Sequence, residues 1–223
     1  MTAITRALAI CLSLAGLLVA TTPGWPAPPG RLGRQEALEA MQNGGDVQAR
    51  RAAVEALGET GTRGDQPALL AALRDEDALV RALAERALWL VWGRSGDPEI
   101  DRLFTDGVAQ MGAQTLPEAV QTFTRIIERK PEFAEAWNKR ATIYYVLGEL
   151  DKSLADCDEV IARNPQHFGA LSGYGLIYLQ LDQPARALAY FERALAVNPN
   201  LHQIRSVIEE IRRELRARGD GTI

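Results

Sequence analysis

The sequence predicts an all-α protein, a right-handed α-solenoid built from stacked helix hairpins. Two observations predict this fold class. Pro131, Pro165 and Pro199 are spaced by 34 residues, and other residue types recur in step between them. A second repeat lies upstream with a period of 31 residues, so that Asp46 aligns on Asp77. A fixed period of this length indicates stacked copies of one supersecondary unit rather than a single globular core.

Each 34-residue unit has the pattern of two helices. In the unit 134–167, a first apolar stripe follows helical spacing up to Gly148. Gly148 ends this helix, because glycine tolerates the left-handed conformation that follows a helix C-terminus. A second apolar stripe ends at Asn164, because the residue before Pro165 is pushed out of helical space. The sequence therefore predicts one helix hairpin per unit.

Small residues recur where the two helices of a hairpin would approach each other. Two antiparallel helices come close only where their side chains are short, and a larger apolar residue fills the space beside them. The small series is Gly107, Ala141 and Gly175, with a second at Ala119, Ser153 and Ala187, and the larger series is Phe123, Cys157 and Phe191.

These series resemble the tetratricopeptide (TPR) repeat, whose pattern is W-x2-L-G-x2-Y, then A-x3-F, then P. The resemblance predicts a TPR section at 97–200, in the register 100–133, 134–167 and 168–201. The first unit is the weakest copy, because Gln110 stands where the pattern has tyrosine.

Local signals mark the ends of the predicted helices. Thr115 and Glu118 have the spacing of a capping box, and Asp97 before a proline is typical of a helix start. The segment 201–218 carries one more apolar stripe with arginine and glutamate on its outer face, and 219–223 forms a short tail. A polar outer face is what the capping helix of a repeat stack requires.

The upstream section, 34–96, contains two copies of a run D-x3-R-x2-A-x2-A-L, which includes Arg50 and Arg81. It resembles short HEAT repeats of the phycobilisome-lyase type. Two copies are few for independent stability, so we expect them to pack on the first TPR unit and to form one continuous solenoid, with Trp89 and Trp92 near the junction. The resemblance also raises an alternative function, an enzyme or enzyme subunit of lyase type.

The N-terminus predicts export. Arg6 precedes an apolar run that ends at Ala20, which is the length of a signal-peptide core and too short for a usual membrane span. We expect a signal peptide at 1–22 and a Pro/Gly linker at 23–33, and a periplasmic location in a bacterium. The alternative is an uncleaved leader that anchors the protein to the inner membrane.

The sequence shows no signature of catalysis, cofactor binding or metal binding. Of the two histidines, His167 takes the repeat position of Phe133 and is expected to pack at a repeat junction. The spacings of zinc sites are absent. Asp156 lies in an acidic cluster that a solvated helix face would explain, and Cys157 is expected to be a small buried apolar residue. A net charge of −4 does not indicate nucleic-acid binding.

The TPR resemblance implies that the first helix of each unit lines a concave groove. The predicted peptide-groove residues are Phe104, Val108, Met111, Glu135, Asn138, Thr142, Tyr145, Ser172, Leu176, Leu179 and Gln180. Their apolar strip could be open to a ligand or covered by the chain itself. The basic clamp that holds chaperone tails in some TPR proteins is not expected, because Lys139 alone is basic among its positions.

We therefore expect a non-catalytic interaction adaptor or scaffold in the bacterial envelope. Its predicted ligand is a peptide or helix of an envelope protein, held in the concave groove. We expect no cofactor, no nucleic acid and no stable membrane span after the leader is removed. The sequence leaves the oligomeric state open. It also resembles, over roughly 86–200, exported bacterial TPR proteins without assigned activity.

Overall fold

The computed structural model describes residues 32–43 and 46–219. Within these residues every regular element is a helix, so the prediction of an all-α solenoid is confirmed. The predicted signal peptide lies outside the described residues, as do most of the linker and of the C-terminal tail. No helix in the described ranges is both long enough and apolar enough to span a bilayer.

The described residues form two compact units that divide between Arg94 and Ser95. The first holds the HEAT-like section and the second holds the TPR section. The packing of one unit on the other stays a prediction.

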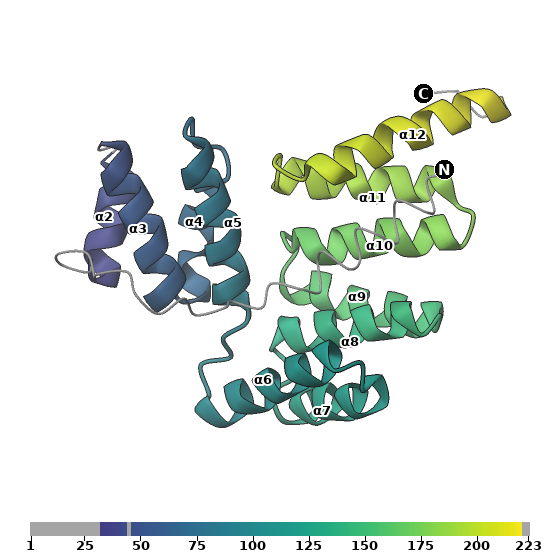
Figure 1. Cartoon of the computed structure of the whole chain (residues 1–223), viewed down its shortest axis with the longest axis horizontal. Helices are drawn as coiled ribbons and strands as arrows, with labels where there is room; N and C mark the ends of the chain where they lie inside the picture. The colour runs from purple at the N-terminus through teal and green to yellow at the C-terminus, as the bar shows by residue number, and fades with distance from the viewer. Residues whose placement is uncertain (1–31, 44–45, 220–223) are drawn as a thin grey trace. The chain divides into compact units, whose positions relative to one another are not determined.

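The N-terminal unit consists of two helix pairs, with a single 3₁₀ turn between them (Figure 1). Its interior is aliphatic, with Leu57, Leu69 and Leu88 fully buried. The elements are α2 (Arg34–Gln42), α3 (Val47–Thr60), η1 (Arg63–Asp65), α4 (Gln66–Ala72) and α5 (Ala78–Trp92).

Ion pairs between arginine and aspartate side chains join the two HEAT-like copies. Arg50 Nε lies 2.8 Å from Asp75 Oδ2, and Arg51 Nη2 lies 2.7 Å from Asp77 Oδ2. Asp77 is also the N-cap of α5 and accepts a hydrogen bond from the Val80 amide at 2.9 Å. The aspartate and arginine of the repeated run thus fix both a helix start and the contact between copies.

The C-terminal unit is a stack of three helix hairpins that a single helix closes (Figure 1). The helices end within one or two residues of the predicted stripes, and Asn164 is the C-cap of α9 as predicted. The elements are α6 (Pro98–Gly112), α7 (Leu116–Arg129), α8 (Ala134–Val146), α9 (Leu150–Arg163), α10 (Phe168–Gln180), α11 (Pro184–Val197) and α12 (His202–Arg218).

The predicted close approach occurs inside each hairpin. A Cβ added at Gly175 would lie 2.4 Å from Phe191 Cε1, and one added at Gly107 would lie 2.8 Å from Phe123 Cζ. In the middle hairpin the small residue is alanine, and the large residue opposite is the smaller Cys157. The two members of the contact therefore compensate each other in size.

A left-handed residue ends the first helix of all three units. The φ angles are 61° at Gln114, 74° at Gly148 and 53° at Asp182, and these positions are one repeat length apart. The prediction for Gly148 is confirmed. The other two units use the same turn with a side chain present. This costs conformational energy at Gln114, whereas Asp182 is of a type that visits the left-handed region more readily.

Both predicted helix starts are correct, but only one has the predicted cap. Asp97 caps α6 and accepts hydrogen bonds from the amides of Glu99 and Ile100. The predicted capping box at Thr115 and Glu118 is wrong. The Thr115 hydroxyl instead donates to the Gln110 carbonyl oxygen at 3.2 Å, because the left-handed turn before it brings that carbonyl close.

Helix α12 closes the stack. Its inner face is buried, and its outer face carries Arg205, Glu209 and Arg212 at the repeat positions of Trp137, Ala141 and Tyr144. Charged side chains at these positions offer no apolar surface on which another helix could pack as the second helix of a hairpin. The buried residues of α12 are Ile204, Val207, Ile208, Ile211 and Leu215.

The hairpin contact predicts opposite outcomes for two glycines of α10. Gly175→Ala should destabilise the protein by about 1–3 kcal/mol through overpacking against Phe191, and Gly175→Leu by at least as much. Gly173→Ala is the matched control, because its Cβ would lie 3.6 Å from Cys157 Sγ, an ordinary contact. The control should be neutral or more stable. Urea denaturation midpoints measure both, and equal midpoints would contradict the assigned register.

The left-handed turns predict a stabilising substitution. Gln114→Gly should raise the free energy of unfolding by roughly 0.5–1 kcal/mol, because glycine adopts the left-handed conformation without the penalty that glutamine incurs. Gly148→Ala, at the equivalent turn, should lower it by a similar amount. Thermal unfolding followed by circular dichroism tests the pair, and a loss of stability in Gln114→Gly would disprove the explanation.

Candidate functional site

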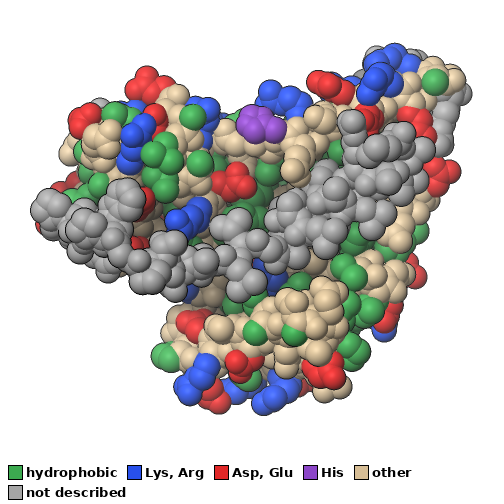
Figure 2. Space-filling view, in the orientation of Figure 1, with side chains coloured by type: hydrophobic (Ala, Val, Ile, Leu, Met, Phe, Trp, Pro, Cys, Tyr) green, Lys and Arg blue, Asp and Glu red, His purple; other side chains and the backbone are tan. Residues whose placement is uncertain are grey.

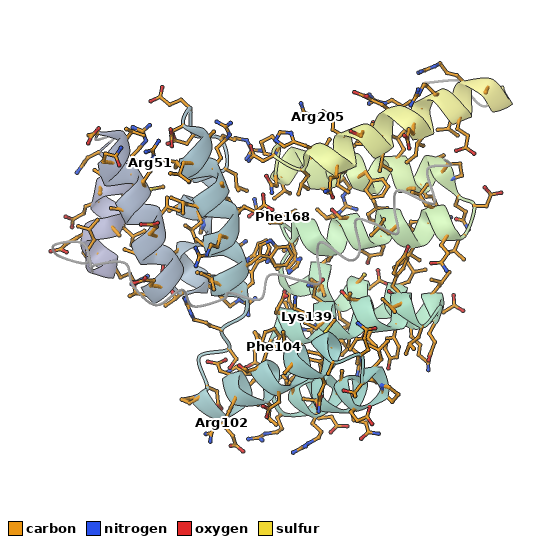
Figure 3. All side chains as sticks on the ribbon, in the orientation of Figure 1. Arg51, Arg102, Phe104, Lys139, Phe168 and Arg205 are labelled. Atoms are coloured by element: carbon orange, nitrogen blue, oxygen red, sulfur yellow. The ribbon has the colours of Figure 1, made fainter. Side chains whose placement is uncertain are left out.

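The predicted groove residues all come from the first helices α6, α8 and α10. We call the side of these helices that carries them the first-helix face. Phe104 on α6 and Lys139 on α8 are labelled in Figure 3, as is Phe168, the first residue of α10, which is fully buried.

On α6 the apolar residues of the face are partly buried. Phe104, Val108 and Met111 pack against the core of the first hairpin. The Phe104 ring meets the rings of Phe123 and Phe133 edge to face, with centroids 5.8 Å and 5.2 Å apart. These side chains therefore have a packing role and retain some exposed surface.

On α10 the structure corrects the expectation of an open surface. Leu176 and Leu179 are only 3% and 6% exposed, because they belong to one core cluster with the inner residues of α12. Ser172 is buried as well, and its hydroxyl donates to the Phe168 carbonyl oxygen. Gln180 is exposed. The capping helix thus covers part of the strip, one of the two outcomes that the sequence left open.

On α8 the face combines a polar and an aromatic part. Thr142 and Tyr145 are partly buried, and the Thr142 hydroxyl donates to the Asn138 carbonyl oxygen at 2.9 Å. Glu135 and Asn138 are buried. A buried polar residue needs partners, and Glu135 has three of them.

Glu135 is the centre of a polar cluster that joins the second and third units. Its Oε2 lies 2.8 Å from His167 Nε2, and its Oε1 lies 3.1 Å from Lys139 Nζ. The Asn138 amide also donates to Oε1 at 3.1 Å. Both carboxylate oxygens are therefore held, one of them by the residue that caps the first helix of the third unit.

His167 has two roles in this cluster. It is the N-cap of α10, and its Nδ1 accepts a hydrogen bond from the Ala170 amide at 3.1 Å. Because Nδ1 accepts, the neutral ring carries its proton on Nε2 and donates it to Glu135. The prediction that His167 packs at a repeat junction is confirmed, since its side chain is fully buried. The capping role and the bond to Glu135 were not predicted.

The surroundings of Glu135 favour the ionised carboxylate. Burial by itself raises the pKa of Glu135, but the Lys139 ammonium and the hydrogen bonds from His167 and Asn138 outweigh burial and lower the pKa to about 2. At neutral pH the carboxylate is charged, and it faces one ammonium group.

In the second and third units the first-helix face carries little net charge. Helix α10 has no charged residue, and on α8 Glu135 and Lys139 pair with each other. Lysine and arginine are interspersed with aspartate and glutamate over the described part of the surface in Figure 2. The face of these two units therefore offers no strong attraction to a ligand of either sign.

A second ionic contact lies between α8 and α9, and it corrects one expectation. Arg140 makes a bidentate pair with Asp156, with both N–O distances 2.8 Å, and also donates to the Thr124 hydroxyl. Asp156 is only 4% exposed, so the interpretation of its acidic cluster as a solvated face is wrong for this residue. Its burial is tolerated because Arg140 satisfies both oxygens.

Two other groups with potential reactivity are held in packing roles. Cys157 is buried, and burial together with the nearby Asp156 and Asp158 raises the pKa of its thiol, as expected for an apolar core position. The Tyr174 hydroxyl donates to Asp158. Among the described residues, no group of three or more His, Cys, Asp or Glu side chains is arranged to hold a metal ion.

Two protein families match the chain. The tetratricopeptide repeat family matches residues 132–200, and the HEAT repeat family matches residues 34–133. The first hairpin, α6–α7, falls in the HEAT match. It nevertheless repeats the glycine–phenylalanine contact of the third hairpin and the left-handed turn of both later hairpins.

Curated relatives match about half of the chain. A TPR repeat-containing protein of Rhizobium etli is 34% identical over 110 residues, which cover 49% of this chain and 54% of that protein. Hsp70-Hsp90 organizing protein 3 of Arabidopsis thaliana is 29% identical over 113 residues, which cover 49% of this chain and 20% of that protein. The chain thus spans about half of the first relative and a fifth of the second.

Solved structures share the fold. The Sgt2 TPR domain from Aspergillus fumigatus has a TM-score of 0.52 at 21% identity, and covers 56% of this chain and 84% of its own. The first TPR of Spaghetti, bound to the HSP90 peptide SRMEEVD, has a TM-score of 0.50 at 22% identity, and covers 52% of this chain and 92% of its own. The repeat register, the hairpin contacts and these matches agree that the chain carries tetratricopeptide repeats after a HEAT-like section.

Proposed function

We propose that this protein is a non-catalytic adaptor that binds a segment of another protein on the first-helix face. The observation that carries the proposal is the alignment of three first helices, whose face keeps partly exposed apolar side chains. Met111 and Tyr145 belong to successive helices and take the same repeat position. Aromatic and methionine side chains suit an adaptable contact with an apolar helix or peptide.

The neighbours named above support a protein ligand. The TPR of Spaghetti holds an HSP90 peptide, and the Arabidopsis relative is named for organizing Hsp70 and Hsp90. We propose the same class of ligand, a protein segment, for this chain, and an envelope protein as its source. The lyase-type alternative predicts a chromophore bound to the N-terminal unit, so visible absorbance of the purified protein would favour that alternative.

We further propose that the protein works in the periplasm after removal of a signal peptide. The apolar run of the leader, with Arg6 ahead of it, supports export. The rival is an uncleaved leader that keeps the protein on the inner membrane.

The binding proposal predicts that Met111→Ala with Tyr145→Ala weakens partner binding by tenfold or more. Aromatic anchors commonly contribute about 2 kcal/mol to binding. The immobilised protein is incubated with an envelope extract, and the captured partner is identified. The dissociation constant of the purified partner is then measured by calorimetry. Helicity should stay unchanged.

The control for this pair is Tyr144→Ala. Tyr144 is the same residue type, one position earlier on α8, but it packs under Arg140 and Lys152, with cation-to-centroid distances of 5.7 Å and 5.3 Å. Tyr144→Ala should leave partner binding intact. Equal losses in the control and the test variant, or no loss in the test variant, would contradict the assignment of the face.

The export proposal predicts a mature protein that begins at about residue 21 to 28, after the apolar run of the leader. Intact-mass spectrometry of the protein from a periplasmic extract measures this. A protein that retains Met1 and fractionates with the membrane would reverse the proposal in favour of the anchored form.

A further inference from the structure

The charges of α8 and α10 have a simple arrangement on the first-helix face. Helix α10, from Phe168 to Gln180, carries no ionisable acid or base other than tyrosine. On α8, Arg140 is committed to Asp156 on α9. The charge balance of the face in the second and third units therefore depends on Glu135 and Lys139.

These two groups neutralise each other, and the carboxylate is fixed in place. Lys139 Nζ lies 3.1 Å from Glu135 Oε1, with the lysine side chain 18% exposed and the glutamate side chain 2% exposed. His167 and Asn138 hold the carboxylate from two further directions. Glu135 therefore stays beside Lys139 instead of moving out to solvent, as an exposed counter-ion could.

We propose that Glu135 determines the specificity of the first-helix face by acting as the built-in counter-ion of Lys139. The partner segment is then one that presents an uncharged, apolar surface, such as the apolar side of an amphipathic helix. Acidic segments are not selected. This inference rests on the proposed function and names the chemistry of the partner.

The physical reason is the cost of separating a buried ion pair. An acidic ligand that paired with Lys139 would have to compete with Glu135, and would leave the buried carboxylate without its cation. A basic ligand would meet a carboxylate that is buried and already has three partners. An apolar ligand surface causes neither loss, and the complementary surface for the charge-neutral part of the face, on α8 and α10, is a neutral one.

The test is the binding of two fluorescein-labelled peptides, the acidic GLEELEEL and its neutral counterpart GLQQLQQL, measured by fluorescence anisotropy at low salt. The wild-type chain should bind the acidic peptide no more tightly than the neutral one. Glu135→Gln should bind the acidic peptide about tenfold more tightly than the wild type does, because a charge-assisted hydrogen bond to Lys139 becomes available. This gain should decrease as salt is raised.

Two further variants identify the cation. Glu135→Gln combined with Lys139→Gln should lose the gain, since the ammonium group is gone. Gln180→Lys adds an exposed cation to α10 without touching the cluster, and should gain a preference for the acidic peptide by itself. Circular dichroism checks that each variant is folded.

A wild-type preference for the acidic peptide overturns the proposal, and this arm does not depend on any variant. A folded Glu135→Gln without a gain overturns it too, as does a gain that survives the loss of Lys139. If Glu135→Gln does not fold, a Gln180→Lys variant without preference contradicts the neutral-face account. The proposed adaptor function fails in a different way, when the wild-type protein shows no partner whose binding depends on Met111 and Tyr145.

Discussion

The close approach of the two helices in each hairpin is the constraint on which the rest of the TPR section depends. Glycine lies against the ring of phenylalanine in the first and third hairpins, and a side chain at either glycine would collide with that ring. In the second hairpin Ala141 faces Cys157, so more volume on one helix is matched by less on the other. The same contact in each unit sets the same hairpin geometry, and repetition of that geometry aligns the first helices.

The polar cluster is a consequence of this alignment. Glu135 near the start of α8 and His167 at the start of α10 are 32 residues apart, yet stacking brings their side chains within hydrogen-bond distance. The second nitrogen of His167 accepts the hydrogen bond that caps α10. The contact between His167 and Glu135 therefore links the start of α10 to α8. One buried carboxylate thereby connects two units and also cancels the charge of Lys139 on the face that we propose as the binding surface.

The sequence correctly predicted the features that follow from its repeat period and from local residue types. The hairpins, the small residues at the helix contact, the turn at Gly148 and the cap at Asp97 each follow from residue type and position along one chain segment. Predictions failed where an outcome depended on a neighbouring helix. Leu179 was expected to line the groove, but α12 covers it. Asp156 was expected to face solvent, but it is buried and paired with Arg140. The role of Glu135 could not be inferred either, because a carboxylate in the first turn of a helix is ordinary until its partner at the start of α10 is known.

The central claim of this account is that the first-helix face, which the repeat register aligns, is the binding surface. Hydrogen–deuterium exchange of the protein with and without its captured partner tests it most directly. The account predicts that partner binding slows exchange in the first helices α6, α8 and α10, and leaves the second helices α7, α9 and α11 unchanged. Slower exchange confined to the second helices, or to α2–α5 of the N-terminal unit, would contradict it.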